Sequence, residues 1–234
     1  MKSYRLYCPV ARAAEIIADR WSTLIIRELL AGSHRFNDLD RGLPGISRPL
    51  LAKRLRRFEH AGIVKRVTAP DRRTVGYYLT PAGQELRAVI ESLGNWGARW
   101  ALGDPRPGEL DPVFLLWRMR RRINLGLVPP SRVVIRFEFR GIKRQRPFWL
   151  VVERSDVSDC MTDPGFETDL VVTADLAAFH KVWLGRSTWD DALRAGLVEV
   201  DGSPVLARGF PHWLQWSPFA GAVREAMLQP PAEA

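Results

Sequence analysis

The stretch from Arg35 to Thr80 constrains the fold of this 234-residue chain more than any other. Within it, Leu43-Pro44-Gly45 separates two short helical patterns, because proline lacks an amide donor and glycine tolerates unusual dihedral angles. Ser47 is a suitable N-cap for the second helix, which is expected to end at Gly62. A strand, a charged turn and another strand follow. This order of elements predicts a winged helix-turn-helix domain.

The second of these helices has two different faces. Leu51, Leu55 and Phe58 repeat at the helical period and predict a buried side. The opposite side combines small and basic residues, as the major groove of DNA requires of a helix. The residues of that side are Pro49, Ala52, Lys53 and Arg56. The pattern favours a recognition helix; the alternative is a small α/β domain whose charged helix is merely solvated.

Ile63–Val67 and Val75–Leu79 predict a β-hairpin wing, and its basic tip contains Arg72 and Arg73. We expect the tip to reach the adjacent minor groove or its phosphates. The predicted DNA-contacting residues are Arg35, Ser47, Arg48, Pro49, Ala52, Lys53, Arg56, Arg72 and Arg73. Among them, Arg48 and Lys53 are the best candidates for reading guanine.

The charge of the chain is distributed unevenly. Residues 1–103 hold 18 Lys and Arg against 9 Asp and Glu, whereas residues 104–234 hold 17 of each. This asymmetry favours double-stranded DNA as the partner of the first half only. No apolar run approaches the roughly 20 residues that span a bilayer. The N-terminus lacks the apolar core of a signal peptide, so we expect a cytoplasmic protein with no membrane partner.

Several short motifs occur in a fixed order along the first hundred residues. They are Cys8-Pro9, Arg20-Trp21, Arg35-Phe36, Leu43-Pro44-Gly45-Ile46-Ser47, and Tyr78-Leu79-Thr80 followed by Gly83. In combination they resemble the HxlR-type regulators, relatives of the MarR group. One departure is the wing, where PDRRT lengthens the turn and Gly76 stands at a position usually held by Glu. The resemblance implies a DNA-binding transcriptional regulator and, by the habit of the family, a repressor.

Thr80-Pro81 predicts the start of a long helix that runs to about Leu102. Apolar residues form a stripe along it at spacings of three and four: Leu86, Val89, Leu93, Trp96 and Trp100. One interpretation is packing on its own domain. The other is dimerisation, which the resemblance implies because this family dimerises through its terminal helices. A homodimer would present two recognition helices to a palindromic site.

Cys8 and Cys160 lie in different predicted domains, so we expect no structural disulfide. The resemblance implies that Cys8 could act as an oxidation switch, since nearby Lys2, Arg5 and Arg12 would favour its thiolate. The alternative is a cysteine without a redox role. The four histidines show no ligand spacing, and we expect no metal and no cofactor.

Two prolines and two glycines within residues 103–108 predict a domain boundary. The predicted organisation is a DNA-binding and dimerisation domain at 1–103, a linker at 104–110, a second domain at 111–228 and a tail at 229–234. In the second domain, the pattern predicts strands at Arg132–Arg140, Phe148–Glu153, Leu170–Thr173 and Leu197–Val200. It predicts one helix that begins at Asp111-Pro112 and two that span Asp175–Leu184 and Trp189–Ala195. A final helical region includes Leu206–Trp216.

In the second domain, a strand enters a helix that ends at Leu184-Gly185. Ala192, Ala195-Gly196 and a strand closing on Asp201-Gly202 follow. This order resembles the sterol-carrier-protein type-two fold, which implies helices on a mostly antiparallel sheet and an apolar tunnel for a hydrophobic or lipid-like effector. Six of the nine tryptophans lie in this half. The candidate ligand-binding residues are Phe137, Trp149, Phe166, Trp183 and Trp213; the alternative is that these aromatics fill the core.

Motifs of catalysis are missing from the sequence: it has no GxSxG, P-loop, dinucleotide fingerprint or Cys/His cluster. We therefore expect an α+β protein of two domains that is not an enzyme. Its expected function is sequence-specific transcriptional regulation, with a hydrophobic small molecule as effector. Two alternatives are a redox-sensing regulator acting through Cys8 and a lipid carrier whose winged helix mediates protein contacts.

Overall fold

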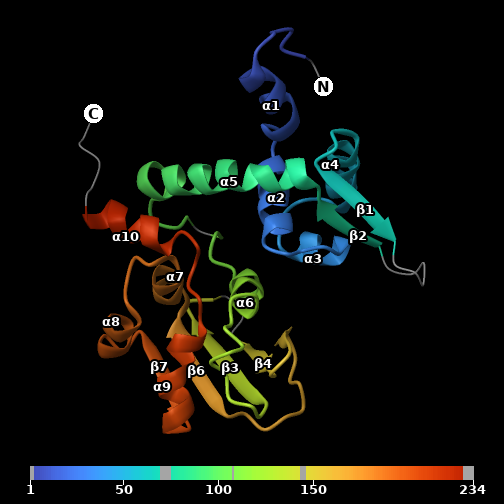
Figure 1. The fold of residues 1–234 in the computed structure, drawn as a ribbon. Helices are drawn as coiled ribbons and strands as arrows, with labels where there is room; N and C mark the ends of the chain where they lie inside the picture. Colours follow the sequence, from blue (N-terminus) through green and yellow to red (C-terminus); the bar gives the residue numbers. More distant parts are fainter. Residues whose placement is uncertain (1–2, 69–74, 107, 143–145, 229–234) are drawn as a thin grey trace. The chain divides into compact units, whose positions relative to one another are not determined.

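The computed structural model describes residues 3–68, 75–106, 108–142 and 146–228. The chain divides into two compact units, Met1–Gly94 and Asn95–Ala234, and both contain helices and a sheet (Figure 1). The predicted α+β class is therefore confirmed. The division falls inside helix α5 (Pro81–Trp100), whereas the sequence predicts a boundary after residue 103; the predicted boundaries stay a prediction.

The first unit contains the predicted helix-turn-helix and wing. Its elements are α1 (Pro9–Ile17), α2 (Ser22–Leu30), α3 (Phe36–Arg41), α4 (Arg48–His60), β1 (Val64–Thr68), β2 (Val75–Leu79) and the first part of α5. The two strands are antiparallel, with Val64 opposite Leu79 and Thr68 opposite Val75. The winged helix-turn-helix prediction is thereby confirmed, with element ends within one or two residues of those expected.

The turn before α4 is made by glycine, as the sequence predicts. Gly45 has a φ of 91°, a left-handed conformation that favours glycine. Ser47 is the N-cap residue of α4, but its side chain makes no capping hydrogen bond within the described structure. Leu51, Leu55 and Phe58 are fully buried. The apolar side of α4 therefore packs against the core of the first unit.

The second unit is built on a five-stranded sheet with the order β5-β4-β3-β6-β7. Its strands are β3 (Val133–Arg140), β4 (Pro147–Val152), β5 (Val157–Cys160), β6 (Leu170–Asp175) and β7 (Val198–Gly202). Only the β3–β6 pair is parallel among the pairs described. The helices are α6 (Pro112–Arg120), α7 (Leu176–Leu184), α8 (Trp189–Arg194), α9 (Pro204–Trp213) and α10 (Ala220–Leu228). The sheet is mostly antiparallel, as expected.

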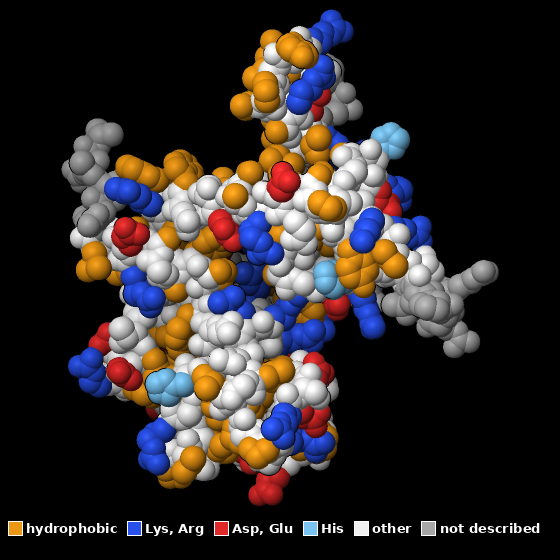
Figure 2. Space-filling view, in the orientation of Figure 1, with side chains coloured by type: hydrophobic (Ala, Val, Ile, Leu, Met, Phe, Trp, Pro, Cys, Tyr) orange, Lys and Arg blue, Asp and Glu red, His pale blue; other side chains and the backbone are white. Residues whose placement is uncertain are grey.

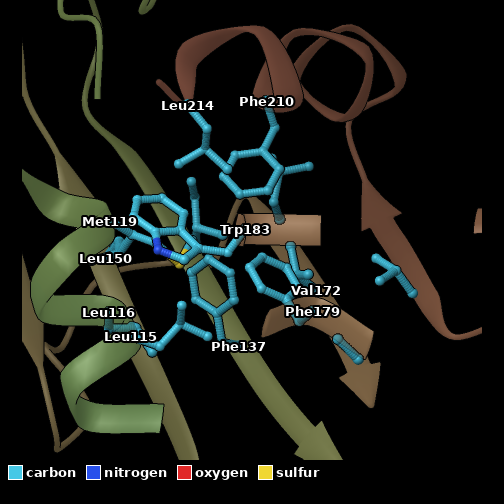
Figure 3. Close-up of a cluster of buried hydrophobic side chains, with 14 of the residues drawn as sticks. Leu115, Leu116, Met119, Phe137, Leu150, Val172, Phe179, Trp183, Phe210 and Leu214 are labelled. Carbon is cyan, nitrogen blue, oxygen red and sulfur yellow. The ribbon is translucent and has the colours of Figure 1, made fainter. Parts of the chain in front are cut away.

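One face of this sheet carries the core of the second unit. Figure 3 shows Phe137 of β3, Phe179 and Trp183 of α7, and Phe210 of α9 pointing toward one another. The ring centroids of Phe137 and Phe179 lie 6.2 Å apart in an edge-to-face arrangement, which aromatic pairs prefer. Large buried rings at close spacing make this interior a packed core.

Among the described residues, none of the helices has the length and hydropathy that crossing a membrane requires.

Candidate nucleic-acid interface

The outer side of α4 is exposed at the positions that the sequence predicts to contact DNA. Ser47, Arg48, Pro49, Lys53 and Arg56 are exposed, and Ala52 is half-buried. The side chains of Lys53 and Arg56 have no partner among the residues that the structure describes. They lie opposite the buried Leu51, Leu55 and Phe58 on the same helix. A polyanion can therefore approach this side without displacing an existing ion pair from either cation.

Arg48 differs from these two cations because it is bound within the protein. Its guanidinium donates to Asp40 Oδ2 at 2.5 Å and to Asn37 Oδ1 at 3.0 Å. The same guanidinium lies 4.8 Å from the centroid of the Phe36 ring. Since all three partners belong to α3, Arg48 connects the two helices of the motif. Reading guanine would require Arg48 to leave these partners, so Lys53 is the better placed of the two predicted guanine readers.

The inner edge of α4 is held by an acidic residue that the sequence analysis missed. Asp19, in the turn before α2, accepts hydrogen bonds from Arg54 at 2.5 Å and from Arg57. Burial raises the pKa of this carboxyl, but the two guanidiniums lower it more, so the pKa lies below its ordinary value. Asp19 thus balances the inner cations of α4. In the sequence, only the spacing of Arg54 and Arg57, three residues apart on one side of the helix, indicated that they could share an acidic partner.

The wing is tied to the beginning of α3. The amide of Tyr77 donates to the His34 carbonyl oxygen at 2.8 Å, and His34 Nδ1 lies 3.2 Å from the Tyr77 carbonyl oxygen. The ring of Tyr78 stacks on that of His34 with centroids 4.4 Å apart. A Cβ at Gly76 would lie 2.6 Å from the Tyr78 ring, so a larger residue at position 76 would require this ring to shift. The base of the wing is therefore attached to the helix-turn-helix through His34.

Basic residues extend from α4 onto the wing. Lys65 and Arg66 on β1 are exposed, and sequence reasoning did not include them. Arg35, at the N-cap of α3, is exposed as predicted, and its backbone pairs with that of Gly76. The predicted wing contacts Arg72 and Arg73 lie outside the described residues.

Helix α5 carries the stripe of apolar residues that the sequence predicts. Val89, Leu93, Trp96 and Trp100 are exposed by 45%, 49%, 59% and 54%, while Leu86 is half-buried against the core of the first unit. Tyr7 and Val10, at the beginning of α1, are also exposed. Hydrophobic side chains reach the surface along α1 and α5 (Figure 2). Packing within the chain thus accounts for Leu86, whereas Val89, Leu93, Trp96 and Trp100 stay exposed.

The five candidate ligand-binding residues are not gathered around one cavity. Phe137, Trp183 and Trp213 are buried in the core of the second unit. Trp149 is buried but does not belong to that core cluster, because neighbouring residues of a strand point to opposite faces. Phe166 is 43% exposed, with the Arg132 guanidinium 3.9 Å from its ring centroid. Their role as a ligand site stays a prediction.

Both cysteines are free thiols and half-buried. Cys8 is the residue before α1. Burial, with the nearby Asp159 carboxylate, raises the pKa of the Cys160 thiol. The oxidation switch at Cys8 stays a prediction.

Comparisons with known proteins bear on the first part of the chain. The HxlR-like helix-turn-helix family matches residues 16–104. The uncharacterized HTH-type transcriptional regulator YvaP of Bacillus subtilis is 34% identical over 110 residues, which are 46% of this chain and 94% of that protein. Rv3095 of Mycobacterium tuberculosis, described in the same words, is 43% identical over 109 residues, or 45% of this chain and 65% of that protein.

A solved structure of the redox regulator HypR in its reduced form is 30% identical and covers 38% of this chain and 90% of that one, with a TM-score of 0.37. At this TM-score the likeness carries no conclusion about the present chain.

Proposed function

The chain belongs to the HTH-type transcriptional regulators with an HxlR-like helix-turn-helix, and from this premise we propose how it binds DNA and responds to a signal. It binds an operator as a homodimer, with the outer side of α4 in the major groove. A hydrophobic small molecule bound by the second unit changes its affinity for that operator. Repression is the proposed direction of the effect, in keeping with the family resemblance.

One observation carries the DNA-binding proposal: Lys53 and Arg56 project from the side of α4 opposite its buried side and have no partner among the described residues. An exposed cation without a partner gains most from a phosphate or a guanine edge, since it gives up only water. Phosphate contacts supply affinity on any sequence, whereas a base contact discriminates between sequences. Lys53, near the middle of α4, is the proposed base contact.

The homodimer is supported by the stripe on α5. Four exposed apolar residues on one helix, two of them tryptophans, form the kind of surface that a second copy of the chain covers. A twofold axis at this stripe relates two α4 helices to each other, so the DNA site that they bind together is expected to be palindromic.

Ligand control is supported by the composition and fold of the second unit. Residues 104–234 carry equal numbers of cationic and anionic residues, so this half lacks the electrostatic attraction to DNA of residues 1–103. Helices on a mostly antiparallel sheet agree with the proposed sterol-carrier-like fold. An effector acts only if it binds the operator-competent and operator-incompetent states with different affinity.

A selection from random DNA duplexes tests the proposal for any operator sequence. Purified protein is expected to enrich an inverted repeat whose half-sites are separated by about one helical turn, roughly 10 base pairs. The same selection with Lys53→Ala should lose the enrichment, while Arg208→Ala, an exposed cation of α9, should retain it. Failure of the wild-type protein to enrich any sequence would contradict the DNA-binding proposal and favour a carrier whose winged helix contacts proteins.

A further inference from the structure

The second unit contains a pocket of about 550 Å³ between residues 101–106 and 109–110 on one side and helix α7 on the other. This volume lies within the range of roughly 300–1,000 Å³ that is usual for small-molecule sites. Polar and apolar side chains both line the pocket, and it is separate from the five aromatic residues considered above. The residues that line it include Leu102, Leu110, His180, Lys181, Leu184 and Arg186, and the carboxylates of Asp104 and Glu109 also lie there.

The wall formed by residues 101–106 is fastened to the end of α7. Arg186 donates to the Gly103 carbonyl oxygen at 3.0 Å and to Asp104 Oδ1 at 3.2 Å. Glu109 closes the same segment by accepting a hydrogen bond from the Arg106 amide at 2.7 Å. The guanidinium of Arg186 is therefore already neutralised, and this part of the pocket is held in shape without a ligand.

Two polar groups of the pocket that belong to α7 are not engaged. The Nε2 atom of His180 is buried without a hydrogen-bond partner in the described structure. Burial lowers the pKa of His180 to about 4, although the Asp111 carboxylate acts in the opposite direction, so the imidazole is neutral at pH 7. Lys181 is exposed next to His180, and its ammonium group has no partner among the described residues. An orphaned buried nitrogen and a free cation thus face the same cavity.

The lining of the pocket indicates which kind of ligand it would bind. Leu102, Leu110 and Leu184 offer an apolar surface, which favours a hydrocarbon or aromatic body. A carboxylate at the end of that body accepts from the Lys181 ammonium and, in the Nε2–H tautomer, from His180. We propose that this pocket binds an amphipathic carboxylate, with its acid group at His180 and Lys181 and its apolar body against the three leucines.

A regulatory consequence rests on the proposed function. Residues 101–106 follow α5 directly in the chain, and a ligand held between them and α7 stabilises one arrangement of these residues. If that arrangement differs in operator affinity, the ligand changes operator binding by roughly 5- to 150-fold, the usual range of such couplings. Binding itself does not depend on this step.

Isothermal titration calorimetry on the full chain tests the site, with sodium decanoate and 1-naphthoate as aliphatic and aromatic probes. Decan-1-ol serves as the probe without a charge. At least one carboxylate should bind with a stoichiometry of one per chain, and decan-1-ol should bind at least about tenfold more weakly, or about 1.4 kcal/mol. Absence of heat for both carboxylates, or equal affinity for the alcohol, would overturn the proposal.

Matched variants locate the binding. Lys181→Gln should weaken the carboxylate about tenfold, again about 1.4 kcal/mol. Arg208→Gln, the same change of charge at an exposed site on α9, should leave it unaltered. Leu102→Glu places a like charge in a wall that is 40% exposed, so it should abolish binding without disturbing a core. Wild-type affinity in both pocket variants would place the ligand elsewhere and overturn the assignment.

Operator binding measured with and without saturating probe separates the two proposals. A probe that binds at Lys181 but leaves operator affinity unchanged sustains the site and refutes its regulatory role. Absence of specific operator binding under either condition contradicts the proposed function, whereas the calorimetric result on the pocket stands independently.

Discussion

Gly83, in the first turn of α5, lies against the backbone of the wing. A Cβ at this position would be 2.1 Å from the Ile63 carbonyl oxygen, and a backbone atom cannot move aside as the end of a side chain can. Gly83→Ala should therefore destabilise the first unit by about 1–3 kcal/mol, the usual cost of overpacking. Urea unfolding of the full chain, followed by circular dichroism, measures this change.

Gly97 on the same helix is the control for Gly83. A Cβ at Gly97 would meet no atom within 4 Å, so Gly97→Ala should be neutral or stabilise α5 by up to about 1 kcal/mol. Equal effects of the two substitutions would contradict the close contact between α5 and the wing.

The exposure of a side chain was predictable where it depends on the periodicity of one helix, whereas a partner on another element was not predictable. Lys53 and Arg56 follow from the periodicity of one helix, and the structure leaves both exposed. Arg48 belongs to the same side, yet Asp40 and Asn37 engage it. These partners lie 8 and 11 residues earlier on another helix, so only the angle between α3 and α4 brings them within reach. A sequence pattern contains no such angle.

At the scale of the element, the position of α4 depends on Asp19. Asp19→Asn removes the charge that Arg54 and Arg57 share and should destabilise α4 locally by on the order of 1 kcal/mol. Hydrogen exchange of the α4 amides at pH 7 measures the effect. Asp201→Asn, at an exposed position of β7, is the control and should leave α4 exchange unchanged.

The effect of Asp19 should depend on pH in a defined direction. Its pKa in the folded protein lies below the ordinary value of 3.8, so its contribution to stability is fully present above that value. The contribution is lost as the pH falls through the folded pKa. The difference between wild type and Asp19→Asn, corrected for intrinsic exchange, should therefore shrink below about pH 4. A difference that grows on acidification would contradict the ion pairs.

The exposed stripe on α5 gives a further prediction at this scale. Leu93→Glu should convert the proposed dimer into a monomer, because two copies of the charge would face each other across an apolar contact. Sedimentation velocity distinguishes the two species. Val205→Glu places the same change on α9, at a residue that is 70% exposed, and should leave the dimer intact. Dimerisation of Leu93→Glu at wild-type affinity would exclude the stripe as the interface.

The ends of helices were predictable because a capping residue acts within a few residues of the chain. Asp111 accepts from the amides of Val113 and Phe114 at the start of α6, and Gly185 has a φ of 82° at the end of α7. Strand β5 was missed because Val157–Cys160 is only four residues long, too short for an alternation to register. The parallel pairing of β3 with β6 joins Ile135 to Leu170. No local pattern specifies such a long-range contact.

At the scale of the whole molecule, the proposed DNA binding belongs to the first unit and the proposed ligand binding to the second. Residues 1–103 carry the entire excess of positive charge, and the exposed cations of α4 and β1 belong to them. The second unit contributes a packed core and the pocket at His180 and Lys181. The charge asymmetry between the halves was visible in the sequence. The pocket was not, because residues 101–106 and 109–110 are brought next to α7 only by folding.

Fluorescence anisotropy with DNA from immediately upstream of the protein's own gene tests the central claim most directly. Wild type, Lys53→Ala and Arg208→Ala are compared on this DNA and on a scrambled duplex over a series of salt concentrations. Wild type and Arg208→Ala should bind the upstream DNA specifically, with an affinity that falls steeply with salt. Lys53→Ala should lose about 1–3 kcal/mol on that DNA and little on the scrambled duplex, if Lys53 reads a base. Equal and weak binding of all three proteins to both duplexes would contradict operator recognition by α4 at this site.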